Sequence, residues 1–90
     1  MIRDEVLKRG TSWVERGRKT AIATIVRVFG SSSEPLGARM VATEDDFHGA
    51  VSGGCVETDV RETAREVIAS GRAQMLHYDH VEDADLDVGL

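Results

Sequence analysis

The order of apolar segments in this 90-residue chain predicts an α+β fold, a two-layer domain with two main helices on a mixed sheet of about four strands. Two segments repeat apolar residues at helical spacing. Between and after them lie short runs rich in β-branched residues, which are typical of strands. The expected order of elements is therefore helix, strand, hairpin, helix, strand.

The first half of the chain is expected to form a helix over about residues 2–17, followed by a strand and a loop. One helical face collects the apolar residues Ile2, Val6, Leu7, Trp13 and Val14. Gly10 weakens this helix, and Gly17 is a suitable C-terminal stop. Ala21–Phe29 is nearly continuous apolar sequence, as in a central strand covered on both faces. Gly30–Gly37 is rich in Gly, Ser and Pro and predicts a loop.

The middle of the chain predicts a hairpin and a second helix. Residues 38–43 and 47–51 are short apolar runs on either side of a polar turn, a pattern typical of a hairpin. The second helix collects Val56, Val60, Ala64, Val67 and Ile68 on one face. Gly71 follows directly and predicts the end of this helix.

The last part of the chain is expected to contain one strand and a tail. Ala73–Tyr78 predicts the strand, although its alternation is impure. From His80 onward the sequence holds four acidic residues, Glu82, Asp83, Asp85 and Asp87. Charge runs usually face solvent, so this segment is expected to bury little.

Composition narrows the class of protein. Eleven Lys and Arg against sixteen Asp and Glu give a net charge of −5, which argues against binding nucleic acid or an anionic membrane through a broad basic face. One cysteine excludes an internal disulfide and suits a reducing, cytoplasmic location. The start has no signal-peptide pattern, and no apolar run approaches the ~18 residues of a membrane span. A domain of this size gains burial by homo-oligomerisation or by a partner domain.

The most informative segment is Ser52-Gly53-Gly54-Cys55, a bend between an apolar run and a predicted helix start. The N–H groups at a helix start are unpaired and the helix dipole favours negative charge there. A thiol in this place has a lowered pKa and binds metals better. The bend thus predicts a binding site for an anionic or metal-bearing ligand beside a thiolate. The alternative to a ligand-binding role is structural: Cys55 would be a small buried hydrophobic residue, and Gly53 and Gly54 would only form a turn.

A second candidate region is the Gly30–Gly37 loop, which follows the predicted central strand. Open α/β sheets commonly bind ligands at such strand ends, and Arg39, just beyond the loop, is able to grip a phosphate or carboxylate. The alternative is a solvated link. The sequence matches neither the P-loop pattern nor the dinucleotide-binding glycine pattern.

The three histidines do not form a zinc-binding pattern. His77 and His80 are three residues apart, but Cys55 lies far from them in sequence. A catalytic pair of Cys55 with His48 or His77 as base remains an alternative.

Four segments together resemble the N-terminal domain of the XdhC/CoxI family: Ala21–Val28, Gly30-Ser31-Ser32, Gly37-Ala38-Arg39-Met40 and Val51–Glu57. Members are accessory factors for molybdenum hydroxylases such as xanthine dehydrogenase and aerobic carbon monoxide dehydrogenase. The resemblance covers nearly the whole chain. It implies binding of the molybdenum cofactor (molybdopterin), help with its sulfuration, in which a cysteine desulfurase is a further partner, and delivery to the apo-hydroxylase. It does not imply turnover of a diffusible substrate.

The resemblance also implies a set of cofactor-binding residues: Gly30, Ser31, Ser32, Gly37, Arg39, Ser52, Gly53, Gly54 and Cys55. Within this set, Cys55 would contact the metal or shield its oxidation-sensitive ligands. Family members usually carry Pro-Arg where this chain has Ser33-Glu34, so the loop lacks that cation. Members often continue into a second, dinucleotide-binding-type domain, so residues 1–90 are expected to match the N-terminal domain alone. Two alternative functions remain: a self-associating interaction module with a decayed ligand site, and a sulfur carrier that uses the Cys55 thiol.

Overall fold

The structure, a computed structural model, describes residues 4–32, 34–51, 56–81 and 83–90. These residues form two helices and five strands: α1 (Glu5–Glu15), β1 (Ala21–Ser31), β2 (Arg39–Ala42), β3 (Phe47–Gly49), α2 (Glu57–Ser70), β4 (Met75–Val81) and β5 (Asp83–Gly89). The strands make one sheet in the order β3-β2-β1-β5-β4, and every neighbouring pair is antiparallel. The α+β class is confirmed; the sheet has one strand more than expected, and the described pairings include no parallel pair.

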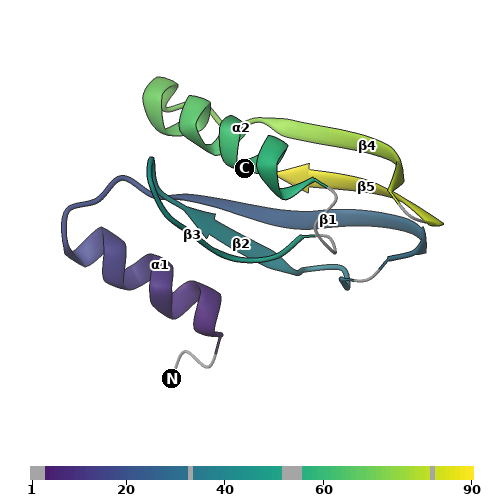
Figure 1. Cartoon of the computed structure of the whole chain (residues 1–90), viewed down its shortest axis with the longest axis horizontal. Coiled ribbons are helices and arrows are strands. Elements are labelled where there is room, and N and C mark those ends of the chain that lie inside the picture. Colours follow the sequence, from purple (N-terminus) through teal and green to yellow (C-terminus); the bar gives the residue numbers. More distant parts are fainter. Residues whose placement is uncertain (1–3, 33, 52–55, 82) are drawn as a thin grey trace.

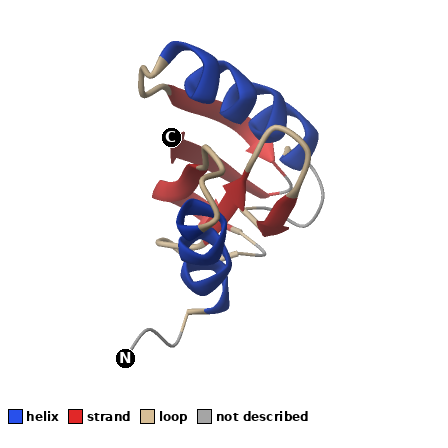
Figure 2. Ribbon diagram, turned by 90° about the vertical axis from the view of Figure 1, so that its left-hand side faces the viewer, coloured by secondary structure: helices blue, strands red, loops and turns tan. Residues whose placement is uncertain are grey.

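One helix lies on each face of the sheet (Figures 1 and 2), which differs from the expected two layers. Helix α1 packs on β2 and β3, whereas α2 packs on β1 and β2 from the opposite side. The arrangement follows from β2, in which the consecutive residues Met40, Val41 and Ala42 are buried: Val41 faces α1, while Met40 belongs to the core on the α2 side. None of the described helices is long and apolar enough to cross a membrane.

Helix α1 is fixed by its cap and by a close approach to the sheet. The Asp4 carboxylate accepts hydrogen bonds from two first-turn amides at 2.9 and 3.3 Å. A Cβ added at Gly10 would lie 3.0 Å from Cγ1 of Val41, so glycine permits the contact with β2. Gly17 follows the helix with a φ of 79°, as expected of a C-terminal stop.

Helix α2 ends where the sequence predicts. Gly71 adopts a left-handed conformation with a φ of 71°, and its N–H donates to the Val67 carbonyl at 2.8 Å. The buried face of α2 covers the main core cluster, which consists of Ala23, Ile25, Met40, Val51, Val56, Val60 and Val88. A smaller cluster of Ala21, Ala42 and Ala64 continues it.

Strand β1 is central, as predicted, but the expectation of cover on both faces is wrong. Ala21, Ala23 and Ile25 are buried on the α2 side, whereas Ile22 and Val26 are 44% and 48% exposed on the other. The cause is the position of α1, which packs mainly on β2 and β3 and leaves most of β1 without a helix on that face.

The segment after His80 is not a solvated tail, so that expectation is also wrong. Strand β5 lies between β1 and β4, and its residues Ala84, Leu86 and Val88 are buried. Because side chains alternate along a strand, the acidic residues between them face the other side of the sheet. Pairing with β5 also extends β1 through Gly30 and Ser31, two residues that the sequence assigns to a loop.

Candidate functional site

The bend at the start of α2 is described only by its two flanks. Ser52, Gly53, Gly54 and Cys55 lie outside the described residues, and their predicted role stays a prediction. Val51 before the bend and Val56 after it are both buried in the main core cluster. The packed core therefore holds both ends of the connection from β3 to α2 (Figure 1).

The first turn of α2 carries two carboxylates, and each has a protein donor. Oε1 of Glu57 accepts a hydrogen bond from the Val51 N–H at 3.3 Å, so this side chain joins the two flanks of the bend. Oδ2 of Asp59 accepts from the Tyr78 hydroxyl of β4 at 2.5 Å. The N-cap residue Val56 has no side-chain capping bond. These two carboxylates thus connect the helix start to Val51 and to β4.

The Tyr78 hydroxyl remains a donor over a wide pH range. Burial of the ring, followed by the hydrogen bond to the Asp59 carboxylate, raises the pKa of Tyr78 above its usual value of 10.0. The neutral phenol is the form that donates to the carboxylate. The bond between β4 and α2 is therefore present at neutral pH.

The end of the Gly30–Gly37 loop lies beside the flanks of the bend. The Gly37 N–H donates to the Ile25 carbonyl, and the Ile25 N–H donates to the Ala38 carbonyl, both at 2.9 Å. Ala38 packs against the core cluster that contains Val51 and Val56. The structure thus brings two of the segments singled out in the sequence to one region of the core. A Cβ at Gly37 would meet no described atom within 4 Å.

The other loop residues and Arg39 lie elsewhere. Gly30 and Ser31 pair with β5 at the end of β1, and the Ser32 hydroxyl accepts from the Glu34 N–H at 3.3 Å. The Arg39 Nη1 lies 3.2 Å from Oδ2 of Asp4, the cap of α1. Its guanidinium is therefore on the α1 side of the sheet, away from the α2 start.

The histidines also separate. His77 contacts the Asp87 carboxylate through Nδ1, and its Nε2 lies 2.7 Å from Asp79. Hydrogen bonds to Asp87 and then Asp79 raise the pKa of His77 above 6.5. This group faces away from α2, because Asp87 alternates with buried Leu86 and Val88. Among the described residues, no group of three or more His, Cys, Asp or Glu is placed to hold a metal ion.

Sequence reasoning missed the supporting contacts of Glu57, Asp59 and Tyr78. The contact of Glu57 lies outside the capping-box pattern, in which the third helical residue bonds the N-cap N–H: Glu57 is the first residue of α2 and its partner Val51 lies six residues earlier. The pairing of Asp59 with Tyr78 has no local signal, since nineteen residues separate them.

Comparison with known proteins identifies relatives. The XdhC and CoxI family matches residues 13–79. The molybdenum cofactor insertion chaperone PaoD of Escherichia coli is 36% identical over 74 residues, which are 81% of this chain and 23% of PaoD. A crystal structure described as a xanthine dehydrogenase from Bacillus halodurans has a TM-score of 0.80 and 27% identity, over 92% of this chain and 29% of that chain. This chain therefore spans less than a third of either relative. By these matches, the chain belongs to the XdhC and CoxI family.

Proposed function

We propose that this chain binds the molybdenum cofactor and assists its insertion into an apo molybdenum hydroxylase. The observation that carries the proposal is the similarity to PaoD, a molybdenum cofactor insertion chaperone. In this proposal, the chain also helps a cysteine desulfurase to sulfurate the cofactor, and its target is an enzyme of the xanthine dehydrogenase or carbon monoxide dehydrogenase type. It acts in the cytoplasm as a homo-oligomer. The chain acts as an accessory protein rather than as an enzyme.

The start of α2 fits the anionic end of the cofactor, which is a phosphorylated pterin. A helix of this length attracts negative charge at its N-terminus. The carboxylates of Glu57 and Asp59 accept hydrogen bonds from the Val51 N–H and the Tyr78 hydroxyl. These neutral donors hold the carboxylates in place but leave them charged, so both oppose a bound phosphate. In this proposal, the main-chain N–H groups of residues 53–55 supply the remaining donors.

The cofactor also has a thiophilic end, where a dithiolene binds molybdenum. Soft thiolate ligands suit such a metal, and Cys55 is the only cysteine of the chain. When bound, the cofactor supplies the metal centre that the target enzyme uses in hydroxylation. The open space at Gly37 supports its inclusion as a contact of the pterin. Since Arg39 is paired with Asp4, we assign the anionic end to main-chain donors rather than to this guanidinium.

The test is an anaerobic titration of the protein with isolated molybdenum cofactor. We expect Cys55→Ser to weaken binding about tenfold, equivalent to about 1.4 kcal/mol. We expect Glu57→Gln to tighten it about twofold to fivefold, because a negative charge near a helix start is worth about 0.3–1 kcal/mol. Ser70→Ala at the other end of α2 is the matched control and should change nothing.

The outcomes separate the parts of the proposal. Equal affinity of Cys55→Ser and the unchanged chain would remove the thiol role and leave cofactor binding. Absence of binding by every variant would refute the cofactor-binding function of this chain. A trappable persulfide on Cys55 would instead support the sulfur-carrier alternative.

A further inference from the structure

Strand β4 forms one edge of the sheet, next to β5 (Figure 1). The strand at the other edge, β3, has three residues and contacts α1, whereas β4 has seven residues. The two helices pack on β1, β2 and β3. The outer side of β4 is therefore an open edge of the part of the sheet that the structure describes.

The backbone groups of β4 point alternately toward β5 and toward the open edge. Gln74 and Leu90 exchange both of their hydrogen bonds, at 3.0 and 2.8 Å. In an antiparallel pair such bonded residues recur at every second position. The N–H and carbonyl groups of Met75 and His77 therefore point away from β5. An edge of this kind is able to pair with a further strand.

The main core cluster reaches this edge on the α2 side of the sheet. Leu76, Tyr78 and Val81 of β4 pack against the cluster but are only partly buried. A strand added beside β4 would remove more of their apolar surface from water, which favours association. The α2 side of β4 thus gains burial when the edge is paired.

The other face of β4 carries two groups of opposite charge. His77 lies 2.7 Å from Asp79 through Nε2 and contacts Asp87 of β5 through Nδ1. The further charges of this face, Asp85 and Asp87 on β5 and Arg27 on β1, lie one and two strands farther from the edge. A strand that pairs with β4 would therefore meet His77 and Asp79 first.

Antiparallel pairing of β4 with a second copy of itself would match these two charges. With a two-fold axis at Tyr78, His77 of each copy lies directly opposite Asp79 of the other copy. Side chains opposite each other on antiparallel strands are ~4.5–5.5 Å apart, and opposite charges stabilise such a pair. Each imidazole then has a carboxylate on its own strand and one across the axis, so the four charges alternate in sign. A strand of other sequence leaves Asp79 opposite an unmatched residue, so the charges select a second copy.

We propose that β4 pairs with β4 of a second copy of this chain, so that two five-stranded sheets continue into one. The pairing is antiparallel, and reciprocal contacts of His77 with Asp79 flank the two-fold axis. This mode of binding is β-strand addition, in which main-chain hydrogen bonds join the strands and side chains give the specificity. The inference rests on the homo-oligomeric state in the proposed function and assigns a surface to it.

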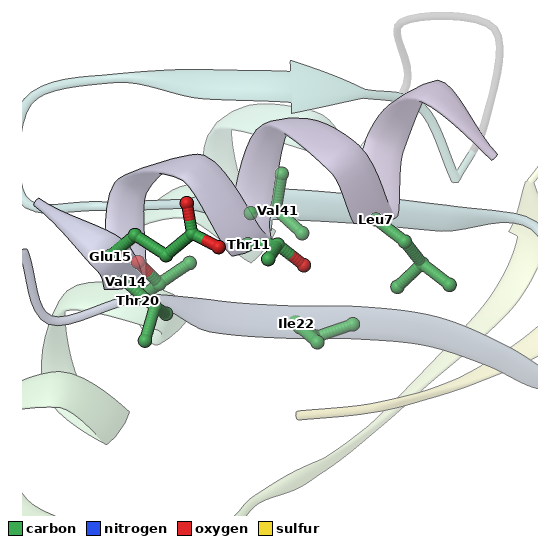
Figure 3. A pocket seen from close by; sticks show the side chains of 8 residues that line it. Leu7, Thr11, Val14, Glu15, Thr20, Ile22 and Val41 are labelled. Atoms are coloured by element: carbon green, nitrogen blue, oxygen red, sulfur yellow. The ribbon is translucent and has the colours of Figure 1, made fainter. Parts of the chain in front are cut away.

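An apolar groove between α1 and β1 provides a control surface away from the β4 edge. It has a volume of about 230 Å³, and Leu7, Val14 and Ile22 are among the residues that line it (Figure 3). Val14 is 59% exposed. A dimer built on this groove would depend on Val14, whereas a dimer built on β4 would not.

The test combines sedimentation velocity of the whole chain over a range of concentrations with amide hydrogen exchange followed by NMR. We expect a monomer–dimer equilibrium, and protection of the His77 N–H that rises with concentration. Asp79→Lys places a cation opposite His77 and should raise the dissociation constant at least tenfold. Asp45→Lys, the same change of charge between β2 and β3, and Val14→Lys in the groove should each change it less than twofold.

Several outcomes would overturn the proposal. A monomer at every concentration, a dimer in which the His77 N–H exchanges as fast as in the monomer, or equal effects of Asp79→Lys and Asp45→Lys would each exclude it. Dissociation by Val14→Lys alone would assign the dimer to the groove instead. If Asp79→Lys does not fold, hydrogen exchange of the unchanged chain decides. None of these measurements needs the cofactor, so their failure is distinct from a failure of the cofactor titration.

Discussion

Replacement of Leu86 by alanine should strongly destabilise the protein. Leu86 lies in β5 and is 1% exposed. Fully buried Leu→Ala substitutions cost about 2.7–5 kcal/mol, because apolar contacts are lost and a cavity remains. The total stability of a 90-residue domain is about 5–13 kcal/mol at 0.05–0.15 kcal/mol per residue. The substitution therefore removes a large fraction of it.

The assay is urea and thermal unfolding followed by circular dichroism. A loss of 1 kcal/mol lowers the Tm of a domain of this size by about 4–8 °C, so we expect a decrease of at least about 10 °C. Leu36→Ala is the matched control, since Leu36 is 64% exposed and its truncation should cost less than about 0.5 kcal/mol. If both variants unfold at the same urea concentration, β5 is not a core strand and the fold described above is refuted.

Three further predictions follow from single contacts. Gly49→Ala should lower the free energy of unfolding in urea by about 2 kcal/mol or more, because Gly49 has a φ of +99° and a Cβ there would lie 2.4 Å from a β2 carbonyl oxygen. Gly17→Ala should lower it less, because Gly17 has a φ of +79° but a Cβ there would meet no described atom within 4 Å. Equal losses for the two variants would contradict the steric argument. Hydrogen bonds to two carboxylates, of which that of Asp87 has the larger effect, raise the pKa of His77. The charged His77 ring therefore stabilises the fold fully below pH 6.5, and this contribution is lost as the pH rises through the raised pKa. Asp87→Asn should lower the His77 midpoint in an NMR titration, and an unchanged midpoint would disprove the pairing. In an ultraviolet titration, Tyr78, the only tyrosine, should ionise above its usual pKa of 10.0, mainly because it is partly buried. The protein should lose stability as the pH rises through that raised pKa. Ionisation at the ordinary value would show that the ring is solvated.

Most of the secondary structure was predictable from local patterns. The second helix has a clear apolar face and ends at Gly71, whose left-handed conformation the sequence implies. Strand β5 was missed for a physical reason. Its three aspartates dominate the composition, but Ala84, Leu86 and Val88 alternate with them and form the buried face. Period-two alternation was therefore the better signal than charge.

The candidate site was only partly predictable. The sequence pattern predicts a helix directly after the glycine-rich segment, and α2 begins at Glu57. The contacts that hold its surroundings do not follow from sequence pattern, because they depend on the strand order: Tyr78 reaches Asp59 only when β4 lies on the side of the sheet that α2 covers. Arg39 is a similar case, since its partner Asp4 lies thirty-five residues away in sequence.

The place of β5 between β1 and β4 also has a consequence for biosynthesis. Among the strands that the structure describes, the ribosome makes β1 first and its neighbour β5 last. Until about fifty more residues have been translated, one edge of β1 has no partner, and closing that long loop is entropically costly. Such non-local pairing slows folding, and unpaired strand edges favour aggregation. This domain is therefore most vulnerable during synthesis just before β5 leaves the exit tunnel.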